Sequence, residues 1–346
     1  MKFRSRALMD ATQHLTRVAI YGAGRWANRT HIPNLLKLDG VEIVALCDVN
    51  PEALRATAAA FPIPRTYADG HEMLRNEEID ALYSVVPAFA RTDVEVAAAA
   101  KGIPLFSEKP QALTMQVARA IDDAVRRSGV LSTVCFRERY RPLFQRARDL
   151  LKDKQVVHVR FQYIGGLPAP PPPERKDSWW SQYDKSGGGA FDWGVHAVDY
   201  TRFMTGLNVT HAQAFYCQRP AYHIPLTSSF NFRLSSGATM TATFVSATPA
   251  GRPEEPWFTI FYEGGHLALY RYDRIEVNNE TVYQGEAFDP WFEQTRLFIE
   301  AVRTGDRGLL LNDYHDGLFS LAPVLAGWAS ARRNGACIDV AAFMED

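Results

Sequence analysis

Short apolar runs alternate with helix-like segments along the first 130 residues. The apolar runs are rich in β-branched side chains and cover residues 17–22, 41–48, 79–86 and 103–108. The segments between them are rich in Ala, Leu, Arg and Glu, and they predict helices at residues 25–38, 51–60, 93–101 and 115–128, with a turn at 71–75. Strands that alternate with helices in this way predict βαβ units and a parallel sheet covered on both faces.

The pattern changes after residue 132. A helical segment at 142–151 precedes four stretches in which apolar and polar residues alternate, at residues 156–165, 228–247, 257–271 and 274–283. Such alternation, broken by Gly or Asn turns, predicts antiparallel strands with one solvated face. Helical spacing returns over residues 291–306 and 310–335, and the proline-rich stretch 167–177 predicts a stiff extended loop.

These patterns predict two domains, as the length of 346 residues also suggests. We expect a parallel α/β domain over residues 1–133 and an α+β domain with a mainly antiparallel sheet over residues 134–346. The formal net charge of -1 gives no basic excess for binding nucleic acid. No apolar run approaches the ~18 residues of a membrane span, and the N-terminal segment lacks the apolar core of a secretory signal. The four cysteines form no C-x-x-C pair, so we expect a cytoplasmic protein.

A glycine-rich loop follows the first predicted strand. Gly22, Gly24 and Ala27 form a G-x-G-x-x-A pattern at the start of the first helix. The first glycine permits a tight turn, the second lets the backbone approach a pyrophosphate, and the small third residue lets helix and strand pack closely. The helix N-terminus offers free N–H groups to the phosphates. With a strand before it and a helix after it, the loop predicts a Rossmann dinucleotide-binding domain.

Asp48 ends the second predicted strand, near the position of the carboxylate that binds the adenosine ribose in such domains. A carboxylate accepts hydrogen bonds from the ribose diol and repels a 2′-phosphate. NAD is therefore predicted over NADP, although Arg55 and Arg65 are close enough in the sequence to leave NADP open.

The segment 186–199, "SGGGAFDWGVHAVD", places three ionisable side chains at helical spacing behind three glycines. Asp192, His196 and Asp199 stand at positions i, i+4 and i+7, so a helix would carry them on one face. Three interpretations are open: a metal site, a helix start with a core histidine, and an acid/base site. A metal site needs further ligands, and no second His or Cys cluster is evident in the sequence.

The fourth strand ends in Glu108, Lys109 and Pro110, at the sheet edge where α/β proteins bind ligands. Together, the stretches 18–35, 108–110, 187–199, 298–306 and 320–335 resemble the Gfo/Idh/MocA family, which takes its name from glucose–fructose oxidoreductase, inositol dehydrogenase and a rhizopine-catabolism protein. The resemblance covers nearly the whole chain. It implies an N-terminal Rossmann domain, a C-terminal α+β domain with an open-faced antiparallel sheet, and NAD(P)-dependent chemistry on sugars or polyols.

The resemblance also implies roles for individual residues. Lys109 and His196 are the expected catalytic pair, and Asp192 is expected to bind substrate or orient the site. The residues expected to bind the dinucleotide are Gly22, Gly24, Arg25, Trp26, Ala27, Asp48, Pro87, Glu108 and Lys109. No metal is expected. The partners expected are a sugar-like small molecule and further copies of the chain, as a homodimer or homotetramer, with no nucleic acid and no membrane.

The sequence departs from the family pattern at several positions. Gln111 follows the E-K-P segment, and Ala88 and Arg91 stand where the family often has Asn and His. Arg137 replaces the Asn of a Phe-Asn-x-Arg motif, so Arg137 or Arg139 is a candidate for binding an anionic substrate. Four aromatic residues that could stack on a sugar or belong to the core precede the His196 segment: Tyr163, Trp179, Trp180 and Tyr183.

Two other functions remain open within this fold. One is an NAD-dependent glycosidase that works by transient oxidation. The other is a dinucleotide-binding regulator without catalysis.

Overall fold

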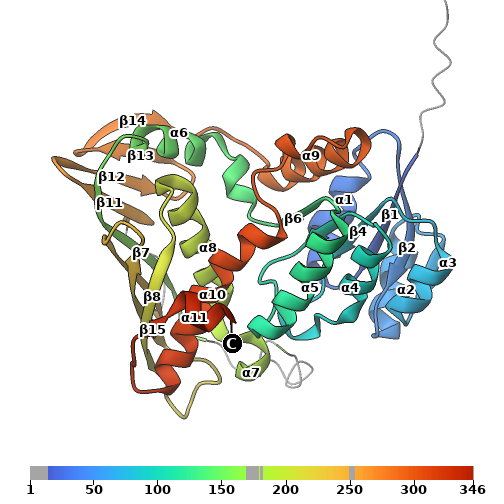
Figure 1. Cartoon of the computed structure of the whole chain (residues 1–346), viewed down its shortest axis with the longest axis horizontal. Coiled ribbons are helices and arrows are strands. Elements are labelled where there is room, and N and C mark those ends of the chain that lie inside the picture. Colours follow the sequence, from blue (N-terminus) through green and yellow to red (C-terminus); the bar gives the residue numbers. More distant parts are fainter. Residues whose placement is uncertain (1–14, 169–178, 180–181, 249–253, 346) are drawn as a thin grey trace, which may run out of the picture.

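The computed structural model describes residues 15–168, 179, 182–248 and 254–345. These residues form two β-sheets with helices packed between and around them (Figure 1). Most of the predicted proline-rich loop 167–177, as well as Trp180, lies outside the described residues. Within the described residues, no helix combines the length and apolar character needed to cross a bilayer.

The first sheet is parallel, and its strand order is β3-β2-β1-β4-β5-β6. This order confirms the predicted Rossmann arrangement, in which the ligand crevice lies where the strand order reverses, between β1 and β4. The strands are β1 (Thr16–Tyr21), β2 (Val41–Cys47), β3 (Arg65–Tyr67), β4 (Ala81–Ser84), β5 (Leu105–Ser107) and β6 (Ser132–Val134).

Polar residues that cap the backbone begin most helices of this half of the chain. Asn50 accepts hydrogen bonds from two backbone N–H groups at the start of α2, and Thr92 and Glu95 form a capping box at α4. The first helix contains a π-helical turn, a feature common near functional sites. The helices are η1 (Ala27–His31), α1 (Ile32–Leu35), α2 (Pro51–Ala60), α3 (Gly70–Asn76), η2 (Ala88–Ala90), α4 (Asp93–Ala100) and α5 (Met115–Ser128).

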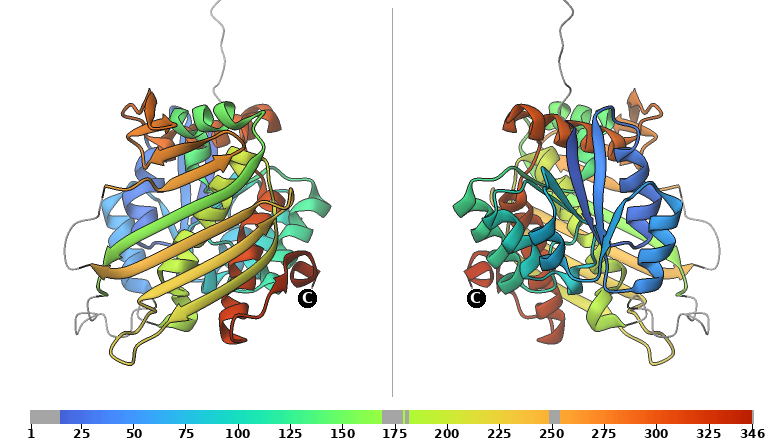
Figure 2. Two further views of the ribbon diagram at one scale, coloured as in Figure 1. Left: turned by 90° about the vertical axis from the view of Figure 1, so that its left-hand side faces the viewer. Right: turned by 90° about the vertical axis from the view of Figure 1, so that its right-hand side faces the viewer.

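The second sheet has nine strands in the order β14-β13-β12-β11-β7-β10-β9-β8-β15. Its neighbouring strands are antiparallel except for β7 and β10, which run parallel at its centre. Figure 2 shows one face of this sheet turned to the viewer, with α8 and α10 behind it. The strands are β7 (Val156–Gly166), β8 (Val209–Cys217), β9 (Thr227–Leu234), β10 (Thr239–Thr248), β11 (Phe258–Tyr262), β12 (Gly265–Tyr270), β13 (Arg274–Val277), β14 (Glu280–Gln284) and β15 (Ile338–Asp339).

Two long helices separate the two sheets. The helices α8 and α10 pack against each other, and α10 also contacts α5 of the first domain. The helices of this half are η3 (Arg137–Tyr140), α6 (Pro142–Leu151), α7 (Tyr183–Ser186), α8 (Gly188–Thr205), α9 (Pro290–Thr304), η6 (Arg307–Leu309), α10 (Tyr314–Arg332) and α11 (Val340–Glu345).

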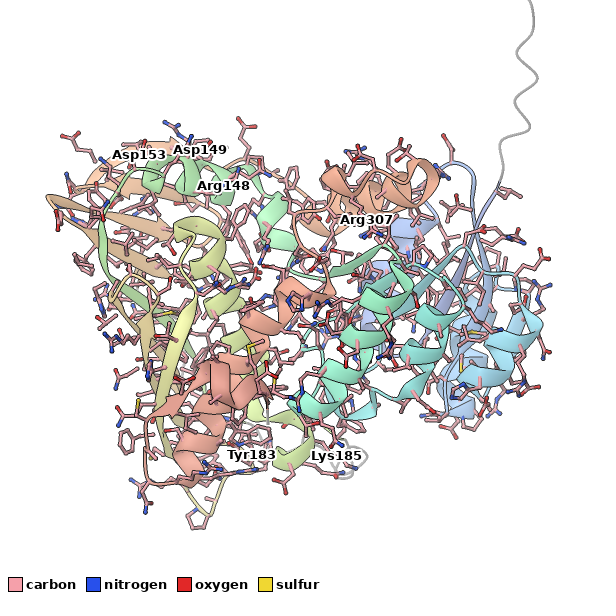
Figure 3. The ribbon with its side chains drawn as sticks, in the orientation of Figure 1. Arg148, Asp149, Asp153, Tyr183, Lys185 and Arg307 are labelled. Carbon is pink, nitrogen blue, oxygen red and sulfur yellow. The ribbon has the colours of Figure 1, made fainter. Side chains whose placement is uncertain are left out.

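The C-terminal half of the chain returns to the first domain through α9, which lies beside α1 in Figure 1. Phe298 and Ile299 of α9 belong to the same buried cluster as Val18 and Ile20 of β1. Arg307, labelled in Figure 3, donates to backbone oxygens of the segment before β6. The boundary predicted at residue 133 stays a prediction, and α9 contributes to the N-terminal core although it lies far beyond that boundary in the sequence.

Candidate active site

The glycine loop after β1 is shaped by contacts with the segment after β4. Gly22 has a φ of +111°, and a Cβ atom there would lie 2.8 Å from backbone atoms of Val85. A Cβ at Gly24 would meet nothing within 4 Å. The protein's own packing therefore requires glycine at Gly22 but not at Gly24, where the exposed backbone is open to a ligand. A pyrophosphate at this helix start fits that arrangement.

The other residues predicted for the dinucleotide lie around this loop. Arg25 and Trp26 are exposed at the helix start, Ala27 is fully buried beneath them, and Pro87 follows β4 on the other side of the loop. Asp48 accepts hydrogen bonds from the N–H of Ala23 at 2.7 Å and from its own loop. The Asp48 carboxylate thus joins the end of β2 to the glycine loop.

Glu108 is buried at the end of β5 and has two hydrogen-bond partners. Its Oε1 lies 2.8 Å from Nε2 of His31, and its Oε2 accepts the backbone N–H of Lys109. Burial would raise the pKa of Glu108, but the hydrogen bond with His31 and the charges around it lower that pKa to about 2. A charged Glu108 therefore anchors the backbone from which the Lys109 side chain extends.

Cys135 lies beside His31 and Glu108. Among the described residues, these three form the one group of His, Cys and carboxylate side chains whose atoms lie close enough together to share a metal ion. Burial raises the pKa of the Cys135 thiol well above its usual value, which keeps it protonated. His31 and Glu108 already bond to each other. The group is thus accounted for as a buried hydrogen-bonded cluster, and the prediction that no metal binds stays a prediction.

Two residues that depart from the family pattern hold the E-K-P segment in place. Arg91 is buried and donates hydrogen bonds to the hydroxyl of Ser84 and to the backbone oxygen of Glu108, so it ties the ends of β4 and β5 together. Gln111 donates to the backbone oxygen of Tyr314 at 2.8 Å. Both departures therefore stabilise the position of the segment that carries Lys109.

Lys109 and Asp192 meet where the two domains join. Nζ of Lys109 donates to Oδ1 of Asp192 at 2.6 Å and lies 3.3 Å from the backbone oxygen of the same residue. The Lys109 side chain is 12% exposed and that of Asp192 is 27% exposed. The pair is thus partly shielded from water yet still reachable by a small molecule.

His196 lies one helical turn after Asp192 on α8 and is almost completely buried. Its Nδ1 lies 2.9 Å from the hydroxyl of Tyr200. Burial lowers the pKa of His196 well below its usual value, and the charges of Lys109 and Arg137 lower it further. The imidazole is therefore neutral at physiological pH, the form that can accept a proton.

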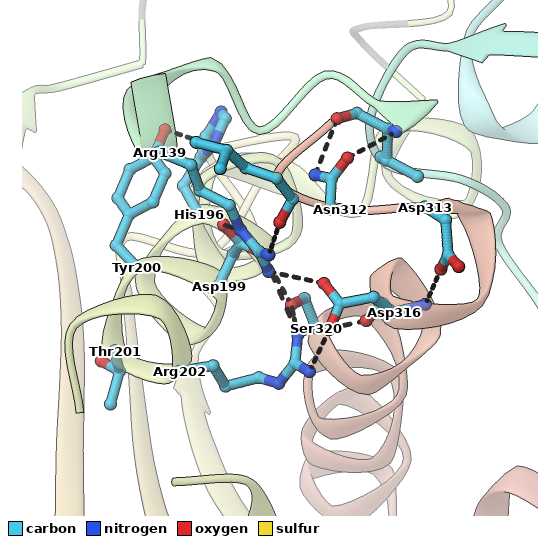
Figure 4. A network of polar contacts seen from close by, with 12 residues as sticks. Arg139, His196, Asp199, Tyr200, Thr201, Arg202, Asn312, Asp313, Asp316 and Ser320 are labelled. Carbon is cyan, nitrogen blue, oxygen red and sulfur yellow. Dashed lines mark hydrogen bonds and ion pairs between the residues drawn. The ribbon is translucent and has the colours of Figure 1, made fainter. Parts of the chain in front are cut away.

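The third ionisable residue of the segment, Asp199, has a structural role (Figure 4). It accepts two hydrogen bonds from Arg139, at 2.6 and 3.0 Å, and one from Ser320. Arg139 and Arg202 both donate to Asp316 of α10 at 2.7 Å. Arg139 is fully engaged in this network, so the hypothesis that it binds substrate is not supported by its contacts.

The glycines of the segment build a turn between two helices. Gly187 and Gly188 have φ values of +64° and +68°, and they join α7 to α8. A Cβ at Gly187 would lie 2.4 Å from Cβ of Phe191. Gly187 is therefore required by a tight turn over Phe191.

The predicted aromatic residues are dispersed in the structure. Tyr183 contacts Trp328 and is labelled on α7 in Figure 3, and Trp179 contacts Phe89. Tyr163 stacks on a ring that the sequence did not suggest, Trp193, at 4.9 Å between centroids.

Trp193 in turn lies 5.4 Å from the ring of His196. The aromatic wall beside the histidine is therefore Tyr163 and Trp193. Its position directly after Asp192 is the feature of the sequence from which Trp193 could have been found.

Two domain models of one family match this chain. The oxidoreductase family with an NAD-binding Rossmann fold matches residues 16–136, and the GFO/IDH/MocA C-terminal domain matches residues 144–268. The chain belongs to the GFO/IDH/MocA family, as its sequence motifs predicted.

Curated relatives match over part of their length. D-apiose dehydrogenase of Paraburkholderia graminis is 31% identical over 198 residues, which make up 54% of this chain and 49% of that protein. The scyllo-inositol 2-dehydrogenase (NAD(+)) of Bacillus subtilis is 28% identical over 204 residues, 57% of this chain and 56% of that protein. The chain thus spans about half the length of the curated relatives it matches.

Solved structures share the fold over almost the whole chain. An oxidoreductase from Thermotoga maritima has a TM-score of 0.79 at 20% identity and covers 95% of this chain and 99% of its own. Levoglucosan dehydrogenase in complex with NADH and levoglucosan has a TM-score of 0.79 at 18% identity, and covers 94% and 99%. These similarities confirm the predicted fold class.

Proposed function

We propose that this protein is an NAD-dependent dehydrogenase or reductase. Its substrate would be a sugar, a sugar derivative or an inositol-like polyol, changed at a hydroxyl-bearing or keto carbon. The observation that carries the proposal is the 2.6 Å hydrogen bond between Lys109 and Asp192, because it joins the sheet edge beside the glycine loop to the helix of His196. The names of the relatives, which refer to apiose and inositol, support the substrate class.

The side chains at this junction meet the needs of the reaction. Oxidation of a secondary alcohol requires a group that takes the hydroxyl proton and a group that stabilises charge on the oxygen. Neutral His196 can take the proton at Nε2, and the ammonium of Lys109 can stabilise the oxygen. Asp192 orients Lys109 and can accept a hydrogen bond from a neighbouring substrate hydroxyl. NAD, when bound, supplies the hydride acceptor.

The direct test is a panel of sugars and polyols incubated with NAD and followed by the absorbance of NADH. Stoichiometric NADH formation with one or more members is the expected result. Bond cleavage without net NADH would favour the glycosidase, and tight NADH binding without turnover on any member would favour the regulator. Either of these two results would contradict the proposed dehydrogenase.

We also propose that the open face of the nine-stranded sheet joins copies of the chain. Phe215 of β8 and Phe261 of β11 are 55% and 37% exposed. Sedimentation of the wild-type chain and of Phe261→Glu tests the predicted homodimer or homotetramer, and equal monomeric mass in both would contradict it. The cytoplasmic location remains a prediction from the sequence.

A further inference from the structure

Three arginines follow each other at alternate positions in η3 and just after it, and their contacts differ. Arg139 donates to the carboxylates of Asp199 and Asp316 and to a backbone oxygen. Arg141 donates to Glu138 and stands over the ring of Tyr272. Arg137 is equally buried, yet no residue that the structure describes accepts a hydrogen bond from its guanidinium.

The nearest carboxylate to Arg137 does not satisfy it. Its Nε lies 3.1 Å from Oε1 of Glu138, but the two atoms are not aligned for a hydrogen bond. Glu138 is shared with Arg141, so two guanidinium charges face a single carboxylate. An uncompensated buried charge is unfavourable, and an anion that reached it would be bound strongly.

The guanidinium of Arg137 lies over an aromatic ring. Its central carbon lies 4.0 Å from the centroid of Trp291, which stacks on Trp26 of the glycine loop at 6.1 Å. The two tryptophans therefore stand between Arg137 and the loop expected to bind the dinucleotide phosphates. Stacking leaves the edge of a guanidinium available for a bidentate contact with a carboxylate.

Arg137 lies close to the proton-transfer residues. The preceding residue, Phe136, contacts the ring of His196 at 6.1 Å. Burial lowers the pKa of His196, and the charges of Lys109 and Arg137 lower it further. Against the effect of burial, His31 and then the charges of Lys109 and Arg137 lower the pKa of Glu108. Among the described residues no ion pair joins Glu108 to Arg137, and the two oxygens of Glu108 bond to His31 and to the backbone of Lys109.

We infer that Arg137 binds a carboxylate of the substrate, so that the substrate class is a sugar acid or polyol acid. This inference rests on the proposed dehydrogenase function. A single carboxylate would balance the one excess positive charge that Arg137 and Arg141 leave over Glu138, whereas a phosphate dianion would bring one negative charge too many. The arginine thus adds specificity to the catalytic pair: it fixes the acid end of the molecule while the hydroxyl end meets Lys109 and His196.

The experiment compares matched pairs that differ only in the acid, such as glucose with glucuronate and galactose with galacturonate. Wild type, Arg137→Met and Arg137→Lys are measured for kcat/KM with NAD. Arg296→Ala removes an exposed arginine of α9 paired with Glu293 and serves as the matched control. We expect wild type to prefer the acids and Arg137→Met to lose about 10- to 100-fold on the acids. Rates on the neutral sugars should change less than about threefold.

Direct binding measurements test the inference independently of turnover. Calorimetric titration of each acid and its neutral partner into protein saturated with NADH is repeated for Arg137→Met. Loss of acid binding in Arg137→Met, with acid binding kept by wild type, supports the inference. If no member of the pairs is oxidised, that separate result counts against the proposed function and not against the inference. Equal binding of acid and neutral sugar by wild type overturns it. Weaker NADH binding by Arg137→Met also overturns it, because Arg137 would then serve the dinucleotide.

Discussion

The hydroxyl of Tyr200 lies 2.9 Å from Nδ1 of His196, and the two rings stack one helical turn apart with centroids separated by 5.2 Å. Burial raises the pKa of Tyr200 well above its usual value, so the hydroxyl keeps its proton and can either donate or accept. Both neutral tautomers of His196 are therefore supported by the same partner. Nε2 can accept a proton during oxidation and carry one during reduction.

The depressed pKa of His196 predicts the pH dependence of oxidation. A base whose pKa lies below its usual value of about 6.5 stays unprotonated as the pH falls through 6.5. The rate of oxidation limited by His196 should therefore hold at pH 6.5 and fall only at lower pH. A profile of kcat/KM against pH on an oxidised substrate checks this, and an acid limb at or above pH 6.5 assigned to His196 would be inconsistent with its burial.

Removal of either proton-transfer residue should slow the reaction while cofactor binding persists. Lys109→Ala and His196→Ala should each lose about 10²–10⁴ in turnover, the usual cost of removing a general acid or base. Fluorescence titration with NADH should give nearly unchanged affinity, because the glycine loop and Asp48 are untouched. Asp192→Asn should lower turnover or raise KM.

The double variant tests whether the two residues act together. Lys109→Ala/His196→Ala should lose less than the product of the two single losses, because both side chains serve one transition state. Near-normal turnover of a folded single variant would remove that residue from the mechanism.

The Asp48 carboxylate should set the preference for NAD. Asp48→Ser removes the expected partner of the ribose diol and the bond to the N–H of Ala23, so it should weaken NAD binding by about 1–3 kcal/mol and relax discrimination against NADP. Titration of wild type and variant with NADH and NADPH measures both effects. Asp39→Ser, an exposed change in the same domain, is the control. Tighter NADPH binding by the wild type would show that the role given to Asp48 is wrong.

Arg139 should matter for stability rather than for substrate binding. Arg139→Met leaves the buried carboxylate of Asp199 without its bidentate partner, which should lower the free energy of unfolding by about 3–5 kcal/mol. Urea unfolding gives the value, and Arg126→Ala at an exposed position should change it little. A stable Arg139→Met protein with raised KM would reverse this assignment.

The sequence predicted both sheets but not all of their strands. The four apolar runs became β1, β2, β4 and β5, because each is a short apolar run that lies between helix-like segments. The strands β3 and β6, with three residues each, were not predicted; β5 is equally short but lies within the longer apolar run 103–108. The strand β8 presents small residues such as Ala212 and Ala214 to the core, which weakens its alternation.

Only part of the candidate site was predicted from the sequence. Local motifs indicated Gly22, Lys109 and His196, since each stands in a recognisable stretch. The partners of these residues come from distant parts of the chain: His31 lies 77 residues from Glu108, and Arg139 lies 60 residues from Asp199. Nothing in a single sequence connects such positions. Only the fold made it possible to separate Arg137, which donates no hydrogen bond to a described residue, from Arg139, which donates to two carboxylates.

The parallel pairing of β7 and β10 has a consequence for how the chain acquires its shape. His158 of β7 pairs beside Thr239, 81 residues later, and the other neighbour of β7, β11, comes later still. As the chain leaves the ribosome, β7 has no strand beside it until after the helix that carries Asp192 and His196 has emerged. Closing the centre of this sheet is a long-range step and hence a slow one. The helix α8, which carries Asp192 and His196, therefore emerges before the centre of this sheet can close.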